Sequence, residues 1–137
     1  MKVKVATATG PTLDLMVAIA LGRYEKCIRD ESRLGVSITD IGLDEHGLPA
    51  VYVPGKGKRA YVRWAPSSDW GQGGPIKEQA RIISGPHGLN TCAAQVAWDA
   101  SKQWLGPTEL VAAMRCFVTN ELGNVVDLPQ EFAWVNG

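Results

Sequence analysis

A segment near the middle of the chain carries the residue types best suited to recognition. Residues 67–76 read SSDWGQGGPI, which places a carboxylate and an indole among glycines. A tryptophan in such a segment needs cover for its large apolar surface, either from the protein core or from a partner. In the first case Trp70 anchors a loop and Asp69 caps nearby amides. In the second case Trp70 stacks on a ligand while the Gly73 and Gly74 amides bind an anion. The sequence leaves both alternatives open.

An arginine interrupts an apolar run closer to the C-terminal end. Arg115 stands between Met114 and Cys116, and helical spacing places it at the flank of the apolar face. It is either solvated or paired within the protein, or it faces Asp69 and helps to hold an anionic ligand. The candidate binding residues are therefore Asp69, Trp70, Gln72, Gly73, Gly74 and Arg115.

The sequence lacks the spacings of several catalytic and metal-binding motifs. It contains no GxxxxGK[ST], HExxH or GxSxG pattern. Its histidines, His46 and His87, stand beside glycines in predicted turns, and Cys27, Cys92 and Cys116 lack CxxC spacing. We therefore predict no catalytic residue, metal or cofactor, and we favour a protein without enzymatic activity. The cysteines are expected to be reduced, partly buried thiols of a cytoplasmic protein.

Composition restricts the class of partner. The chain has 137 residues, and its 14 Lys and Arg balance its 14 Asp and Glu, which argues against a protein that coats nucleic acid. A weak contact with a nucleic-acid backbone remains open through Lys56, Lys58 and Arg59, at the tip of a predicted hairpin. No stretch approaches the ~20 apolar residues of a membrane span, so we expect no membrane association.

Two helices are predicted from apolar periodicity and end signals. The first begins at residues 9–11 (TGP), where proline suits the first turn, and stops at Gly22. The second has Thr108 as its N-cap and stops at residues 123–124. The predicted buried faces consist of Leu13, Met16, Val17, Ala20 and Leu21 in the first helix and Leu110, Val111, Met114, Phe117, Val118 and Leu122 in the second.

The remaining segments predict a small sheet. Residues 65–75 are predicted as a loop because they are rich in Gly, Pro and Ser, and residues 76–83 are expected to pair into the sheet. We therefore predict one α+β domain over residues 1–137, with two main amphipathic helices packed on a small, mainly antiparallel sheet. The predicted strands are residues 2–7, 36–38, 50–53, 60–64, 92–98 and 125–128, with a hairpin turn at 54–58. The segment from residue 92 to residue 104 also fits a helix, and we favour the strand that ends near Trp98.

Several segments resemble a family of bacteriophage proteins. Residues 68–76 (SDWGQGGPI), followed by Glu78, are similar to the S-[TS]-D-W-x-Q-G-G-P-I segment of the phage NinX-like family. Residues 106–108 (GPT) and 112–118 (AAMRCFV) resemble a second segment, whereas residues 23–63 match least. The resemblance implies a small phage or prophage accessory protein, and it assigns no role to the shared residues. These are Asp69, Trp70, Gln72, Gly73, Gly74, Pro75, Met114, Arg115 and Cys116.

Two functions from different classes are compatible with these residues. The favoured function is a non-enzymatic binding module that contacts a host or phage protein, as yet unknown, through residues 69–75. This function requires Trp70 to be at least partly exposed. The alternative is a small enzyme acting on a phosphate-bearing ligand or nucleic acid, and it requires Asp69 and Arg115 to meet in one cleft with Gly73 and Gly74.

Overall fold

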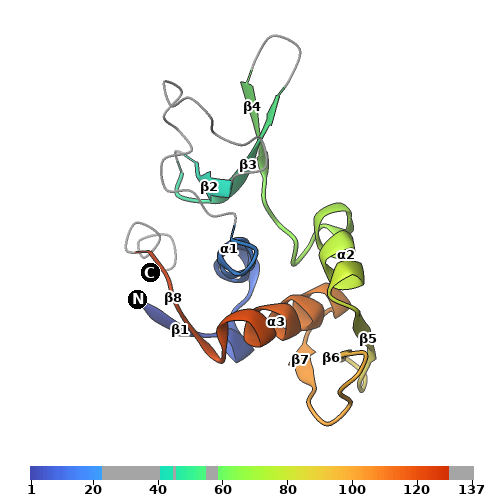
Figure 1. Ribbon diagram of the computed structural model, residues 1–137. Coiled ribbons are helices and arrows are strands. Elements are labelled where there is room, and N and C mark those ends of the chain that lie inside the picture. Colours follow the sequence, from blue (N-terminus) through green and yellow to red (C-terminus); the bar gives the residue numbers. More distant parts are fainter. Residues whose placement is uncertain (23–40, 45, 55–58, 130–137) are drawn as a thin grey trace.

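The computed structural model describes residues 1–22, 41–44, 46–54 and 59–129 (Figure 1). In these ranges it contains three α-helices and three small antiparallel sheets, so the α+β prediction is confirmed. The predicted strand at residues 36–38 lies outside the described residues, as do Cys27, Lys56 and Lys58.

Two helices form the centre of the molecule. Helix α1 (Gly10–Ala20) and helix α3 (Glu109–Leu122) pack against each other, as both predicted helices require (Figure 1). Every residue of α1 from Thr12 to Ala18 is buried, whereas the sequence predicted burial of one face of this helix only. Glycines with φ of +71° and +94° follow these two helices at Gly22 and Gly123, a conformation that L side chains rarely adopt.

One sheet packs against α3. It contains β5 (Ile82–Pro86), β6 (Cys92–Val96) and β7 (Trp104–Gly106), and β6 confirms a strand within residues 92–98. Gly106 allows β7 to approach α3 closely, because a Cβ atom there would lie 2.8 Å from the backbone nitrogen of Ala112. This close approach brings the β7 backbone next to the first turn of α3.

A second sheet covers α1 from the other side. It contains β2 (Ile41–Leu43), β3 (Pro49–Pro54) and β4 (Arg59–Arg63). Strands β3 and β4 form the predicted hairpin, with Val51 opposite Val62. In Figure 1 the sheet lies above α1, which explains why α1 is buried beyond a single stripe. The short strand β2 was not predicted from the sequence.

The two ends of the described chain pair in a two-stranded sheet. Strand β1 (Lys2–Lys4) runs antiparallel to β8 (Val125–Asp127), and the two strands lie side by side in Figure 1. The predicted strand at residues 125–128 is confirmed. The strand predicted over residues 2–7 ends earlier, because a 3-10 turn at Val5–Thr7 redirects the chain into α1.

Helix α2 (Trp70–Gln79) corrects the sequence prediction. Residues 70–75 form its first turns rather than part of a loop, and residues 76–79 continue the helix rather than a sheet. Glycine and proline have low helix propensity, so the prediction failed where tertiary packing outweighed propensity. Pro75 lies inside the helix, and α2 packs against α3 and β5.

Candidate functional site

The start of α2 is fixed by an aspartate. The Asp69 Oδ1 atom accepts a hydrogen bond of 2.8 Å from the Gly71 amide, which makes Asp69 the N-cap. The Asp69 carbonyl also accepts a 2.8 Å hydrogen bond from the Gly73 amide. The predicted capping role of Asp69 is therefore confirmed, and Trp70 becomes the first residue of a capped helix.

Gln72 closes the connection between β4 and α2. Its Oε1 atom accepts from the Ala65 amide at 2.6 Å, and its Nε2 donates to the Arg63 carbonyl at 2.8 Å. Both ends of the side-chain amide are thus used within the protein. Gln72 supports the segment that precedes Trp70 rather than presenting a free amide to a ligand.

Gly73 is a packing position. It is buried, and a Cβ atom there would lie 2.1 Å from the Pro66 carbonyl oxygen and 2.9 Å from Leu110 Cδ2. Only glycine permits α2 to approach the preceding turn and α3 this closely. The Gly73 amide is already bonded to the Asp69 carbonyl, so the predicted anion nest of Gly73 and Gly74 is wrong as far as Gly73 is concerned.

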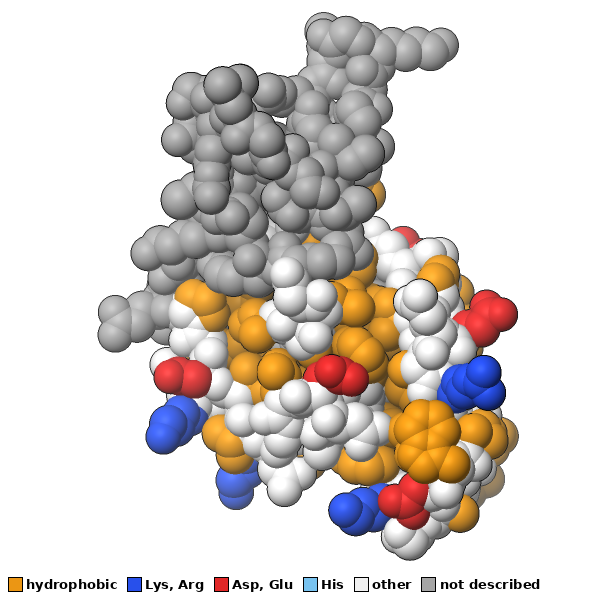
Figure 2. Space-filling view, in the orientation of Figure 1, with side chains coloured by type: hydrophobic (Ala, Val, Ile, Leu, Met, Phe, Trp, Pro, Cys, Tyr) orange, Lys and Arg blue, Asp and Glu red, His pale blue; other side chains and the backbone are white. Residues whose placement is uncertain are grey.

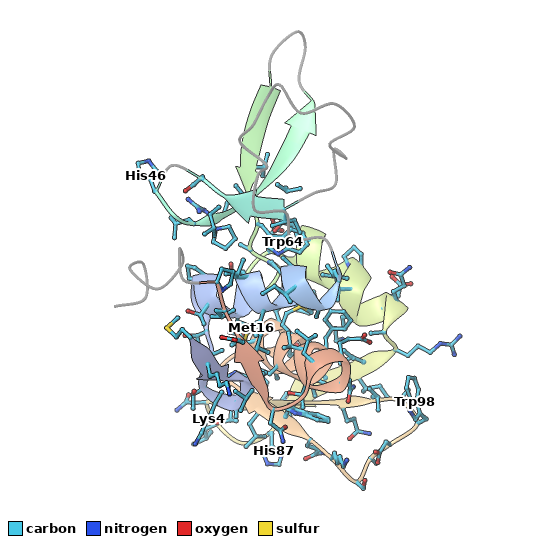
Figure 3. The ribbon with its side chains drawn as sticks, turned by 60° about the vertical axis from the view of Figure 1, so that its left-hand side comes forward. Lys4, Met16, His46, Trp64, His87 and Trp98 are labelled. Atoms are coloured by element: carbon cyan, nitrogen blue, oxygen red, sulfur yellow. The ribbon has the colours of Figure 1, made fainter. Side chains whose placement is uncertain are left out.

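A buried carboxylate in α1 holds the turn that leads into α2. The Asp14 Oδ1 atom accepts from the Ser67 amide at 2.8 Å, and the Asp14 carbonyl accepts from Trp64 Nε1 at 2.9 Å. Figure 3 shows Trp64 between the upper sheet and α1. Burial raises the pKa of Asp14 to about 6, although hydrogen bonds from Ser67 and the charge of Arg63 oppose the shift. Sequence reasoning missed this role, although a carboxylate inside an apolar helical run was a usable signal.

Trp70 presents its ring at the surface of this framework. The side chain is 53% exposed, and the Lys77 ammonium lies 5.9 Å from the ring centroid. Gly74 leaves room beside the ring, since a Cβ there would meet Trp70 Cε3 at 3.8 Å. Trp70 also borders an open cavity of about 490 Å³ that includes Ser67, Ser68, Cys92 and residues 108–111 at the start of α3. In the space-filling view, hydrophobic side chains gather at the centre of one face and charged ones stand around its edge (Figure 2).

Arg115 lies elsewhere and is largely buried. It is only 8% exposed, and it donates from Nε to the Ala8 carbonyl at 3.0 Å and from Nη1 to the Leu105 carbonyl at 2.7 Å. Burial lowers the pKa of its guanidinium. Arg115 lines a second cavity, of about 550 Å³, whereas Asp69 lines neither this cavity nor the one beside Trp70. The structure therefore does not bring Asp69 and Arg115 together in a cavity.

The histidines and the other side chains that could bind a metal ion do not form a cluster among the described residues. His46 lies beside the upper sheet, whereas His87 lies near the bottom of the view in Figure 3. Among the described residues, no group of three or more His, Cys, Asp or Glu side chains is placed to hold a metal ion.

In the same ranges, no helix has both the length and the apolar character needed to cross a membrane. Cys92 and Cys116 are free thiols, and burial raises the pKa of Cys116 to about 11.

A known protein family matches most of the chain. The model of the family described as Bacteriophage P22, NinX matches residues 4–121. The matched range includes both α2 with its N-cap and α3 up to Glu121. No curated protein matches the chain significantly.

Proposed function

The chain belongs to the bacteriophage P22 NinX family, and on this basis we propose that it is a phage or prophage accessory protein acting as a non-enzymatic binding module. Its partner is a host or phage protein that contacts the surface around Trp70. The observation that carries the proposal is the half-exposed Trp70 ring, which stands on the first turn of a capped helix beside an open cavity.

Two physical properties of this ring support a binding role. Tryptophan is enriched among the residues that contribute most to protein–protein affinity, because its large flat ring removes much apolar surface from water. The Asp69 cap and the Gln72 hydrogen bonds hold the backbone beneath the ring in place. A partner therefore has to order little of this surface on binding, which lowers the entropic cost of association.

The alternative enzyme receives less support from the geometry. It requires Asp69, Gly73, Gly74 and Arg115 in one cleft, yet Asp69 caps α2 and Arg115 lines a separate cavity. The Gly73 amide is also bonded within the helix. These three positions serve the folded framework, whereas Trp70 is the large hydrophobic side chain that the segment exposes.

The test is affinity capture from phage-infected host cells with the native protein and two matched variants. The control residue is Trp98, which is 72% exposed. The amide of the preceding residue, Ala97, donates to the carbonyl of Arg81, which lies just after the C-terminal end of α2, whereas Trp70 lies at its N-terminal end. Trp70→Ala and Trp98→Ala therefore make the same change at two exposed rings. We expect a protein that is captured by the native chain and by Trp98→Ala but lost with folded Trp70→Ala. Equal capture by all three proteins would refute the role of Trp70.

Two further features of the proposal stay predictions. We expect the protein to act in the cytoplasm, where free thiols such as Cys92 and Cys116 remain reduced. The second is a weak contact with a nucleic-acid backbone through Lys56, Lys58 and Arg59. If this contact accounts for the captured material, nuclease treatment and modest added salt should each abolish the capture. Capture that survives both treatments would instead indicate a protein partner.

A further inference from the structure

Arg115 is a buried cation without an acidic partner. The residue is 8% exposed, and its two hydrogen bonds go to neutral backbone carbonyls, those of Ala8 and Leu105. In the described part of the chain no carboxylate pairs with it, and its Nη2 atom has no acceptor. Arginine is rarely this buried unless it is paired, since removing the charge from water is unfavourable. Within the described residues, the charge of Arg115 therefore has no counter-ion, and an anion in the adjoining cavity would supply one.

The two carbonyl bonds fix the orientation of the guanidinium. Ala8 precedes α1 and Leu105 lies in β7, so Arg115 on α3 is held from two sides. The close approach of β7 to α3 at Gly106 makes the Leu105 contact feasible. With Nε and Nη1 engaged, the unused donors of the planar group remain for the adjoining cavity, which Arg115 lines.

The open cavity beside Arg115 has the volume of a small-molecule site. Its volume of about 550 Å³ falls within the range usual for ligand pockets. Asn90 and Thr91, from the turn before β6, contribute polar groups. Gln103, just before β7, contributes an amide, and Trp104, the first residue of β7, contributes an indole. The cavity thus combines one buried positive charge, several neutral polar groups and an aromatic wall.

We propose that this cavity binds a small organic monocarboxylate, with the carboxylate on Arg115 and an apolar or aromatic body against Trp104. The planar guanidinium matches the two oxygens of a carboxylate. Among the described residues that line the cavity, Arg115 is the one Lys or Arg, and its single positive charge matches the single negative charge of a monocarboxylate. The proposal does not depend on the Trp70 surface, which lies beside the other cavity.

The test is an NMR titration of the ¹⁵N-labelled full chain that follows the Arg115 Nε–H and Trp104 Nε1–H signals. The probes are benzoate, acetate and inorganic phosphate. We expect saturable shifts of both signals with benzoate and weaker binding of acetate, which lacks the apolar body. No saturable shift with benzoate up to about 20 mM, which corresponds to a binding free energy near −2 kcal/mol, would overturn the proposal. Tighter binding of phosphate than of benzoate would overturn the carboxylate assignment.

Two isosteric variants localise the site. Gln103 lines the cavity and donates from Nε2 to Gln95 Oε1 at 3.2 Å, whereas Gln95 does not line it. Gln103→Glu and Gln95→Glu each add one negative charge to the same hydrogen-bonded pair and leave Arg115 unchanged. We expect Gln103→Glu to weaken benzoate binding about tenfold and Gln95→Glu less than about twofold. Equal weakening by the two variants would place the bound anion outside the cavity and refute the proposal.

Discussion

The carboxylate of Asp14 and the backbone amide of Ser67 are joined by a 2.8 Å hydrogen bond across 53 positions of the chain. This bond ties the middle of α1 to the turn that leads into α2, and so it helps to position Trp70. Both residues are buried, at 4% and 3% exposure. The contact therefore combines a structural role with a titratable group in the interior.

Asp14 gives the protein a pH-dependent stability. Burial raises the pKa of Asp14 from 3.8 to about 6 in the folded state, so the folded protein holds this proton more tightly than the unfolded chain. The stabilisation from protonation is complete below pH 3.8 and is lost as the pH rises through about 6. Across this window the free energy of unfolding should fall by at most about 3 kcal/mol on account of Asp14. Urea unfolding between pH 4 and pH 7 measures the change.

Asp14→Asn is the variant that isolates this effect. Asparagine keeps an oxygen able to accept from the Ser67 amide but carries no charge at any pH. We expect the stability of the variant relative to the native protein to increase from pH 4 to pH 7. A constant difference over that range would show that Asp14 does not titrate in this window.

Adjacent glycines in α2 should respond in opposite directions to alanine. A Cβ at position 73 would overlap the Pro66 carbonyl oxygen, at 2.1 Å, whereas one at position 74 meets only Trp70 Cε3, at 3.8 Å. We expect Gly73→Ala to destabilise the fold by roughly 1–3 kcal/mol, as overpacking does. Gly74→Ala should be neutral or stabilising by up to about 1 kcal/mol, because alanine has the higher helix propensity. Thermal unfolding of both variants tests the prediction, and an equal loss in both would contradict it.

Replacing Gln72 should weaken the connection between β4 and α2. Its amide makes hydrogen bonds to Ala65 and Arg63, and loss of such bonds costs about 1 kcal/mol each. We therefore expect Gln72→Ala to lower the free energy of unfolding by roughly 1–2 kcal/mol. Gln79→Ala, at the exposed last residue of α2, is the control and should change stability by less than about 0.5 kcal/mol. If the two variants unfold at the same denaturant concentration, the hydrogen bonds of Gln72 do not stabilise the connection between β4 and α2.

Cys116 should be slow to react with alkylating reagents. It is fully buried, and its pKa of about 11 leaves roughly one thiol in a thousand ionised at pH 8. Cys92 is only half-buried and provides an internal comparison. Mass spectrometry of the native protein after timed iodoacetamide treatment should show modification at Cys92 well before Cys116. Modification of Cys116 at a similar rate would mean that α3 opens on the timescale of the reaction.

The sequence predicts much of the fold where local patterns are strong. The Thr108 cap is confirmed, since its Oγ1 accepts from the Val111 amide at 3.1 Å, and the hairpin of β3 and β4 is confirmed as well. Helix α2 was missed because Gly73 and Pro75 disfavour a helix locally. Its stability comes from the Asp69 cap and from packing against residues that are distant in the chain.

The sequence by itself determines the family resemblance, the two central helices and the residues of the Trp70 segment. Only the tertiary structure decides which of these residues share a surface. Arg115 and Trp70 line different cavities, and Asp14 meets Ser67 through the packing of α1 against the turn before α2. Periodicity and capping are local properties, so they are readable along the chain. The distance between two side chains depends on how whole elements pack, and both charged groups found inside apolar helical runs, Asp14 and Arg115, obtain their partners only from that packing.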